Sequence, residues 1–307
     1  MTRTLDGVQA CVFDAYGTLF DFASAAARCP GVPEDRRQAL TALWRDRQCQ
    51  YTWLHTLEDR YADFWQVTGD ALDFALESLD LESPRLRERL MDLYLGLEPF
   101  PEVPAVLASL REAGFRIAVL SNGSPMMLDA LVKRSGLETM FDAVLSADAV
   151  RAFKTHPDVY QYALRSLDLE ASAISFQSSN AWDAHGASDF GMLDDLFGSR
   201  DPIPFELKNS QRFNRYVYLR PEPSEPFITL TNEVLTAYPD LKPYGGRFGY
   251  DGVIPHLTVA YHHNDAVLNQ ISVQLEGTRI VTVASVVHLM ECRNDGWCSI
   301  AEFRLGK

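Results

Sequence analysis

The stretch Val12-Phe13-Asp14-Ala15-Tyr16-Gly17-Thr18, close to the N-terminus, constrains the fold more than any other part of the chain. The mostly apolar residues 9–13 are typical of a buried strand, and Gly17 with Thr18 signals a turn directly after it. We therefore expect Asp14 at the carboxyl end of a strand, where open α/β sheets bind their ligands. A carboxylate there can act as a nucleophile and form a covalent ester that water later breaks. An isolated aspartate after a strand more often only caps a turn, so other motifs must decide.

Length and charge narrow the class of protein. The 307 residues suggest about two domains, and the hydrophobic fraction of 47% and charged fraction of 23% are ordinary for a soluble globular protein. The net charge of −14 disfavours nucleic acid and anionic membranes as partners, but it allows a small anionic substrate held by a local arginine or lysine. Residues 1–6 lack the apolar core of a signal peptide, and no apolar run reaches the ~20 residues that cross a bilayer. We expect a cytoplasmic protein with no membrane partner.

The cysteines favour neither a disulfide framework nor a zinc site. They are odd in number and show no Cys-x-x-Cys spacing. We expect buried free thiols. The five are Cys11, Cys29, Cys49, Cys292 and Cys298.

The string Asp14-Ala15-Tyr16-Gly17-Thr18 resembles the first motif of the haloacid dehalogenase superfamily. In the phosphatases of that superfamily, a second aspartate stands at the position of Tyr16 and acts as the general acid. A tyrosine, with an ordinary pKa near ~10, is a poor replacement for that acid. The tyrosine form resembles the branch that cleaves carbon–halogen bonds, in which the leaving halide needs no proton.

Residues 21–100 are predicted to be mostly helical and resemble the helical cap of the dehalogenases. Within them, residues 44–54 resemble the substrate-binding helix of that family. The resemblance implies that Arg45 meets the substrate carboxylate and the departing halide, a role that suits a planar and permanently charged group. An arginine on a helix is most often solvated or paired with a carboxylate, so this assignment depends on the matching string around Arg45.

A β–α–β pattern resumes over residues 101–192 and carries two further motifs. Ser121-Asn122-Gly123 follows a predicted strand and resembles the second superfamily motif, whose hydroxyl and amide can hold substrate oxygens or a halide. Lys154 matches the superfamily lysine that would pair with Asp14 and keep it ionised. Tyr160 falls where the dehalogenases carry an active-site tyrosine.

The segment 173–187 decides between metal-dependent and metal-independent chemistry. Its strand ends in Ser178-Ser179-Asn180 and offers one carboxylate, Asp183, which is too few hard oxygen donors for a magnesium site. The string closely matches the L-2-haloacid dehalogenases, so we expect no metal and no cofactor. That resemblance implies that Ser178, Asn180 and Asp183 position and activate the hydrolytic water and that Trp182 lines the pocket.

Together the motifs imply hydrolysis of short L-2-haloacids, with a small-molecule haloacid as the partner. Asp14 would displace the halide from the back side, and water would then attack the carboxyl carbon of the Asp14 ester. Arg45 and Asn122 would hold the halide, and Ser121 the carboxylate. The resemblance further implies a catalytic role for Thr18 and substrate-binding roles for Tyr16 and Tyr160.

The resemblance stops before the sheet is complete. We expect a dehalogenase-like domain over 1–192, with its core at 1–20 and 101–192, and a loop-like junction over 193–204. Residues 205–307 resemble the C-terminal half of a 2′,5′ RNA ligase-like 2H phosphoesterase, an α+β half-domain. That family needs two His-x-Thr motifs, one histidine as base and the other as acid. The sequence offers only His256 with Thr258.

The expected fold is therefore an α/β Rossmann-like parallel sheet with an inserted cap and without its last strand, followed by the α+β half-domain. An exposed strand edge and an uncovered apolar face are liabilities, so the halves should pack on each other or on a second copy, as in a homodimer. Two other readings stay open. One is a weak or inert fusion that at most binds a partner, and the other is a phosphodiesterase that uses His256.

Overall fold

A computed structural model describes residues 7–213, 215–238, 255–293 and 296–306. Residues 1–6, where a signal peptide was considered, and the side chains of Cys292 and Cys298 lie outside that description. Contacts between Cα atoms divide the chain into two compact units. The first comprises Met1–Asp195 with Met290–Ala301, and the second comprises Leu196–Leu289 with Glu302–Lys307. Each unit is described separately.

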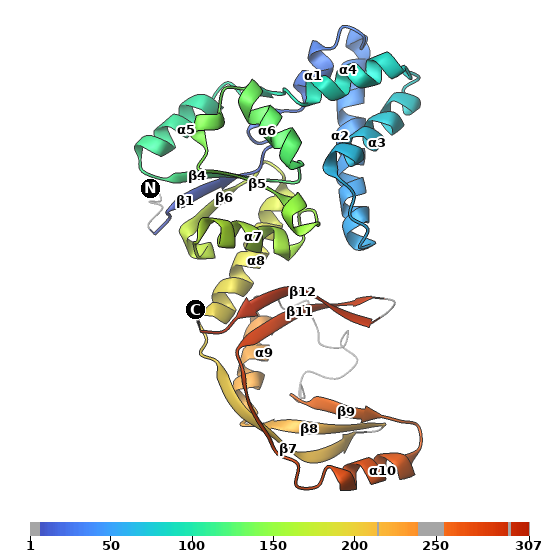
Figure 1. Ribbon diagram of the computed structural model, residues 1–307, viewed down its shortest axis with the longest axis vertical. Helices are drawn as coiled ribbons and strands as arrows, with labels where there is room; N and C mark the ends of the chain where they lie inside the picture. The colour runs from blue at the N-terminus through green and yellow to red at the C-terminus, as the bar shows by residue number, and fades with distance from the viewer. Residues whose placement is uncertain (1–6, 214, 239–254, 294–295, 307) are drawn as a thin grey trace. The chain divides into compact units, whose positions relative to one another are not determined.

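The first unit is built on a parallel sheet of strand order β5-β4-β1-β6, in which β1 lies between β4 and β6. All four residues of β1 are buried, as its apolar sequence predicts, and Figure 1 shows α5 and α6 on one face of the sheet and α7 and α8 on the other. The strands are β1 (Ala10–Phe13), β4 (Arg116–Ser121), β5 (Ala143–Ser146) and β6 (Ile174–Gln177). The helices are α5 (Val103–Glu112), α6 (Pro125–Arg134), α7 (Pro157–Leu167) and α8 (Ala181–Gly198), with 3-10 turns η2 (Glu138–Met140), η3 (Ala147–Val150) and η4 (Ala171–Ala173).

The cap is an insertion between β1 and α5, as expected. The chain enters and leaves it through a short antiparallel pair, β2 (Phe20–Asp21) with β3 (Glu98–Pro99). Asp63 and Ser83 cap two of its helices by accepting hydrogen bonds from backbone N–H groups of the first turn. The cap elements are α1 (Ala23–Arg28), η1 (Glu34–Arg36), α2 (Arg37–Leu57), α3 (Phe64–Ser78) and α4 (Pro84–Tyr94).

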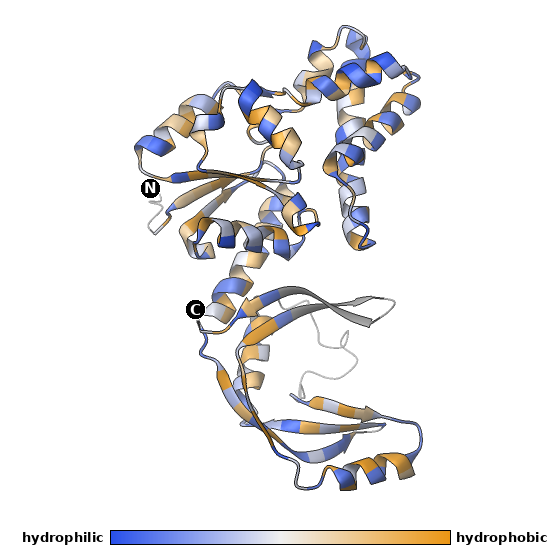
Figure 2. Ribbon diagram, viewed as in Figure 1, coloured by the Kyte–Doolittle hydropathy of each residue, from blue (hydrophilic) through white to orange (hydrophobic). Residues whose placement is uncertain are grey.

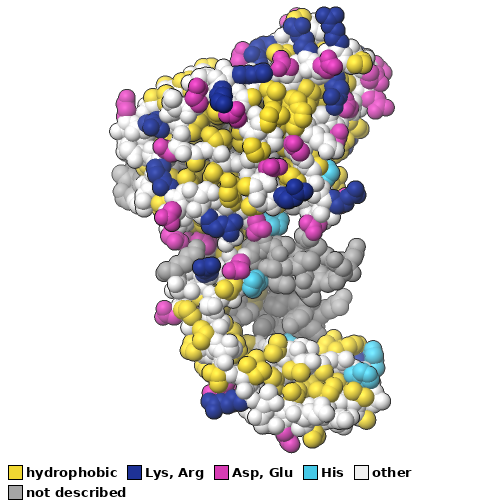
Figure 3. All heavy atoms as spheres, in the orientation of Figure 1, with side chains coloured by type: hydrophobic (Ala, Val, Ile, Leu, Met, Phe, Trp, Pro, Cys, Tyr) yellow, Lys and Arg dark blue, Asp and Glu magenta, His cyan; other side chains and the backbone are white. Residues whose placement is uncertain are grey.

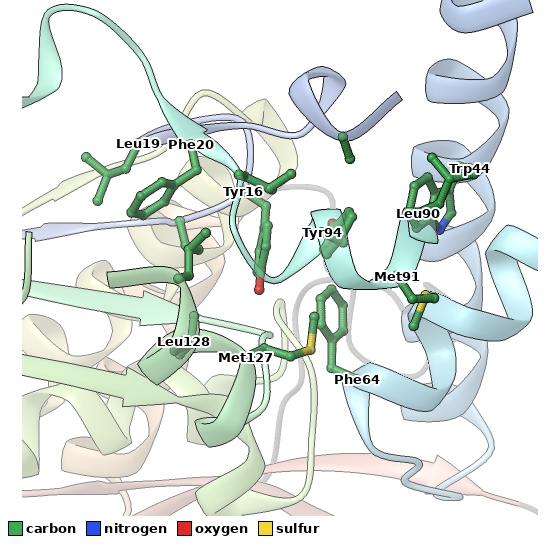
Figure 4. Close-up of a cluster of buried hydrophobic side chains, with 14 of the residues drawn as sticks. Tyr16, Leu19, Phe20, Trp44, Phe64, Leu90, Met91, Tyr94, Met127 and Leu128 are labelled. Atoms are coloured by element: carbon green, nitrogen blue, oxygen red, sulfur yellow. The ribbon is translucent and has the colours of Figure 1, made fainter. Parts of the chain in front are cut away.

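One continuous apolar cluster joins this cap to the sheet. Tyr16 lies where the two meet: its ring stacks on Tyr94 at 5.3 Å and contacts Phe64 at 5.7 Å between ring centroids. Figure 4 shows Tyr16 between Leu19 and Phe20 on one side and these cap residues on the other. The cap is therefore held directly above the carboxyl end of β1, which places cap side chains beside Asp14.

The strand β6 lies at one edge of the sheet. Among the described residues, β6 pairs with β1 alone. The catalytic candidates all stand before or shortly after β6 in the chain, so this open edge removes none of them.

The junction differs from its prediction. Residues 193–198, predicted as loop-like, are the last turns of α8, which runs from Ala181 to Gly198. The physical reason is that Phe190 and Phe197, seven residues apart on one helix face, are both buried, at 5% and 4% exposure. Gly198, the poorest helix former after proline, ends the helix.

The second unit contains an antiparallel sheet of strand order β10-β7-β8-β9. Its strand β9 is apolar yet exposed, with Leu257 at 48% and Tyr261 at 50%. The hydropathy colouring in Figure 2 marks much of β9 as apolar, and Figure 3 shows hydrophobic side chains gathered over this sheet. Its elements are β7 (Ile203–Phe213), β8 (Tyr216–Glu222), α9 (Glu225–Ala237), β9 (Leu257–Tyr261), α10 (Asp265–Gln274) and β10 (Ile280–Ala284). Two further strands, β11 (Val286–Arg293) and β12 (Gly296–Arg304), pair with each other, and each is divided between the two units.

Across both units, no helix in the part of the chain that the structure describes combines the length and apolarity needed to span a membrane.

Candidate active site

Asp14 directly follows β1, in the middle of the sheet, where its neighbours are the ends of β4 and β6. Its backbone N–H donates to the carbonyl of Gln177 at 2.9 Å, so the segments after β1 and β6 leave the sheet together. The carboxylate is 6% exposed. Both of its oxygens accept hydrogen bonds: Oδ1 from Lys154 and Oδ2 from Asn180. The carboxylate is thus held in a fixed orientation.

Lys154 lies between two carboxylates. Its Nζ donates to Asp14 Oδ1 at 3.0 Å and to Asp183 Oδ2 at 2.8 Å, and the lysine side chain is 1% exposed. The backbone N–H of Lys154 donates to Asn122 Oδ1 at 2.8 Å, which fixes the loop after β5 against the end of β4. A buried ammonium ion in this position neutralises one of the two negative charges and joins them in one network.

A magnesium ion does not fit the same place. Asp14 and Asp183 each direct one oxygen at the ammonium of Lys154, so the position that a cation would share is taken by a cation of the protein itself. Magnesium also demands several oxygen donors in octahedral geometry. No group of three or more histidine, cysteine or acidic side chains suited to a metal occurs among the described residues.

Asp183 lies in the first turn of α8 and is fully buried. Burial raises its pKa above the ordinary value of 3.8, with Asp14 adding to the rise while Lys154 and a hydrogen bond from Ser178 oppose it. Tyr160 donates from its hydroxyl to Asp183 Oδ1 at 2.9 Å. Burial first, and then the nearby charge of Asp183, raise the pKa of Tyr160, so its hydroxyl remains a donor. Asp183 is therefore a carboxylate with increased basicity.

The loop after β6 contacts the turn after β1. Asn180 Nδ2 donates to Asp14 Oδ2 at 2.9 Å, and the Thr18 hydroxyl makes a longer contact of 3.4 Å with the same oxygen. Ser179, which sequence analysis did not select, ties the two loops together. Its N–H donates to Thr18 Oγ1 at 2.9 Å and its hydroxyl donates to the Gly17 carbonyl at 2.6 Å. The repeated serine in Ser178-Ser179 was the available signal for this residue.

Arg45 enters the site from the cap. Its Nη1 donates to Gln48 Oε1 at 2.8 Å and its Nη2 to the carbonyl of Tyr16 at 3.3 Å. Gln48, which sequence analysis also missed, is 1% exposed and accepts a further hydrogen bond from the Tyr94 hydroxyl at 3.2 Å. Its position three residues after Arg45, on the same helix face, was the signal that could have identified it. Gln48 fixes the orientation of the guanidinium group.

These groups surround a small cavity of about 10 Å³. Because that volume holds little more than one water molecule, a haloacid must displace side chains or the cap to enter. Trp182 forms part of the wall and packs edge-on against Trp53 at 5.6 Å between ring centroids. Burial raises the pKa of Tyr16 well above its ordinary value, so it is a poor proton donor to a leaving group. The lining is Asp14, Tyr16, Arg45, Gln48, Cys49, Thr52, Phe64, Ser121, Asn122, Lys154 and Trp182.

The structure thus brings together most of the predicted site residues, and it places two groups differently. Tyr160 contacts Asp183 and lines a larger apolar cavity of about 290 Å³ between the sheet and helices α7 and α8, rather than the cavity beside Asp14. The lining of that larger cavity contains no charged side chain and no cysteine, whereas the smaller cavity is lined by Asp14, Arg45 and Lys154, so we assign the site to the smaller one. His256 and Thr258 belong to the second unit and are exposed; the ring of His256 contacts that of Tyr218 at 5.2 Å.

Fold and site together define a hydrolase: a parallel α/β sheet with a helical cap and a buried carboxylate paired with a lysine. The chain belongs to the haloacid dehalogenase-like hydrolase family, whose model matches residues 8–191. Residues 186–296 match the model of the 2′-5′ RNA ligase superfamily. The two matches overlap within α8, so the change of family falls inside a helix.

Curated relatives agree with the first match. The (S)-2-haloacid dehalogenase of Pseudomonas sp. (strain YL) is 47% identical over 188 residues, which cover 61% of this chain and 81% of that protein. A solved L-2-haloacid dehalogenase from Xanthobacter autotrophicus, with chloropropionic acid covalently bound, is 43% identical with a TM-score of 0.57 and covers 60% of this chain and 75% of that one. A further dehalogenase structure is 45% identical with a TM-score of 0.59, covering 61% of this chain and 83% of that one.

Proposed function

We propose that this protein hydrolyses short L-2-haloacids to 2-hydroxy acids through an ester on Asp14, without a metal. The observation that carries the proposal is the buried array in which Lys154 joins Asp14 to Asp183, beside Arg45 from the cap. One carboxylate is fixed for attack and the other has its pKa raised, so the two can act in successive steps.

In the first step, an oxygen of Asp14 attacks carbon 2 of the haloacid from the side opposite the halogen. The carbon–halogen bond breaks and the halide leaves with its electron pair, so the configuration at carbon 2 inverts. Lys154 and Asn180 orient the attacking carboxylate by their hydrogen bonds. Arg45 supplies positive charge for the substrate carboxylate and the departing halide, and Ser121 and Asn122 complete the wall that holds them.

Hydrolysis of the ester is the second step. Asp183 takes a proton from water, and the resulting hydroxide adds to the carboxyl carbon of Asp14. The bond between that carbon and the ester oxygen then breaks, and the leaving alkoxide takes the proton from Asp183 to give the hydroxy acid. Esterification removes the negative charge of Asp14. The positive charge of Lys154 then acts on Asp183 and on the oxyanion that develops as water adds to the ester. Ser178 and Asn180 border this position and would orient the water, while Tyr160 holds Asp183 in place.

The wall of the cavity favours short substrates. Trp182 and the cap residue Phe64 close it with bulky rings, and its volume is about 10 Å³. Each added methylene would require further displacement of close-packed side chains. We therefore propose two- and three-carbon acids as the preferred substrates.

The direct test measures halide release from the two enantiomers of 2-chloropropionate in the presence of a chelator. We expect release from the L enantiomer, D-lactate as product, and no release by the Asp14→Ala variant. A folded native chain that releases no halide from any 2-haloacid would overturn the proposal and favour the inert fusion. Release that stops on chelation and returns with magnesium would overturn the metal-independent mechanism.

We further propose that the dehalogenase-like domain comprises residues 1–192, followed by a junction at 193–204 and a partial 2H phosphoesterase-like domain at 205–307. We also propose that the protein is cytoplasmic and forms a homodimer. The exposed apolar strand β9 supports the homodimer, because such surfaces are normally covered.

A further inference from the structure

Cys49 is a nucleophile in the active site that the proposed hydrolysis does not use. It lies on α2, one helical turn after Arg45, so both side chains are on the same face of the helix. Its thiol is free and half-buried, and it lines the cavity together with Asp14 and Arg45. A haloacid bound there meets two nucleophiles rather than one.

A second observation marks the same cavity as a place that receives a ligand. Tyr16 lines it and is only 2% exposed, yet its hydroxyl has no hydrogen-bond partner within the described structure. The hydroxyl is directed at the second motif: a Cβ atom at Gly123, next to the lining residue Asn122, would lie 2.9 Å from it. A buried polar group without a partner is costly, and a polar ligand would satisfy it.

We propose that Cys49 is an alkylation site for the enzyme's own class of substrate, the 2-halocarboxylates. The sulfur attacks carbon 2 of an acid whose carboxylate is held by Arg45, a sulfur–carbon bond forms, and the carbon–halogen bond breaks. The halide leaves with its electron pair and the thiol proton passes to water, leaving S-carboxyalkylcysteine. The step needs no oxidant and no further reactant. This proposal rests on the proposed function in one respect only, namely that Arg45 binds the carboxylate of the haloacid.

The geometry makes this reaction a slow competitor of catalysis. Burial raises the pKa of the Cys49 thiol, while Arg45 opposes that rise, so the reactive thiolate becomes more abundant as the pH increases. Asp14 is held in place by Lys154 and Asn180, and its ester is hydrolysed, whereas a thioether is not. Each alkylation therefore fills a cavity of about 10 Å³ permanently and ends turnover in that molecule.

The test compares bromoacetate with bromoacetamide, its neutral analogue, on the native chain. Trypsin cleaves after Arg47 and Arg60, so the resulting peptide contains Cys49 and no other cysteine. Mass spectrometry of that peptide gives a labelling rate for each reagent, and the denatured chain gives the intrinsic ratio of the two rates. We expect the folded chain to raise the bromoacetate-to-bromoacetamide ratio by at least about tenfold, since a charged hydrogen bond selects the acid. The Arg45→Gln variant should lose this preference.

A ratio at Cys49 that is the same in the folded and denatured native chain would overturn the inference, without depending on any variant. Labelling of Cys11 or Cys29 in preference to Cys49 would also overturn the inference. Cys11 and Cys29 are only 3% and 0% exposed, so a selective reaction at Cys49 should leave them unlabelled. Halide release measured in parallel separates the two proposals. Turnover without selective labelling overturns this inference alone, and selective labelling of a chain without turnover supports it while overturning the proposed function.

Discussion

The two units differ in how their candidate catalytic residues are placed. In the first unit, groups from the ends of β1, β4 and β6 and from the loop after β5 meet in one buried network around Lys154, and cap residues line the same cavity. In the second, His256 directly precedes the strand β9 and Thr258 lies on that strand, and both residues are exposed. A site assembled from the middle of a sheet survives the loss of an edge strand, whereas a site shared between two halves of a domain does not survive the loss of one half.

Lys154→Met should give the largest effect. It leaves the buried carboxylates of Asp14 and Asp183 without their counter-ion, which typically costs about 3–5 kcal/mol. We expect no measurable halide release and a lower free energy of unfolding by chemical denaturation.

The matched control for that variant is Lys133→Met. Lys133 also contacts an aspartate, Asp129, at 2.8 Å, but both side chains are more than half exposed. Its loss should change stability by less than about 1 kcal/mol. Equal effects of the two substitutions would contradict the buried charge network.

Asp183→Asn should separate the two chemical steps. The variant keeps a similar shape but cannot accept the proton of water, and a lost general base typically slows a reaction by about 10²–10⁴-fold. We expect a burst of one halide per active site and an added carboxyalkyl group on the peptide that contains Asp14. Asp189→Asn, on the same helix, is the control and should turn over normally. Normal turnover by Asp183→Asn would remove that residue from the mechanism.

The pH profile should reveal the environment of Asp183. Its carboxylate must be ionised to accept a proton, and because burial raises its pKa, activity should be lost as the pH falls through that raised value, above 3.8. Tyr160→Phe removes a donor to the ionised form, so the acid limb of kcat should move to higher pH. A limb that stays in place in the variant would show that another group controls it.

His256→Ala should have the smallest effect. Because His256 lies in the second unit, we expect halide release to be unchanged. Neither the native chain nor the variant should hydrolyse cyclic or 2′,5′-linked phosphodiesters above background. Cleavage by the native chain that disappears in the variant would restore the phosphodiesterase hypothesis and weaken the contrast between the units.

The fold of the first unit could be predicted because local signals and family motifs agree there. A buried strand followed by Asp14 and a turn gives β1, and the cap begins and ends where the helical pattern does. The extent of α8 was missed because polar residues at 193–199 suggest a loop, whereas burial of Phe197 extends the helix. Tertiary burial of this kind is not visible in local propensity.

The site could be predicted where a residue carries the chemistry and less well where it supports another residue. Gln48 and Ser179 bond to Arg45 and Thr18, and the only signals for them in the sequence are weak: the spacing of Gln48 from Arg45 and the repeated serine at 178–179. Sequence analysis assigned Tyr160 to the substrate. In the structure Tyr160 lies on α7, and its hydroxyl donates a hydrogen bond to Asp183 in the first turn of α8.

A single turnover in water labelled with heavy oxygen tests the central claim most directly. With enzyme in excess over L-2-chloropropionate, the account predicts that the hydroxyl oxygen of the first product comes from Asp14 and that the label enters the Asp14 carboxylate, as detected by mass spectrometry of its peptide. Label in the product of that first turnover, with Asp14 unlabelled, would show that water attacks the substrate directly and would contradict the ester mechanism.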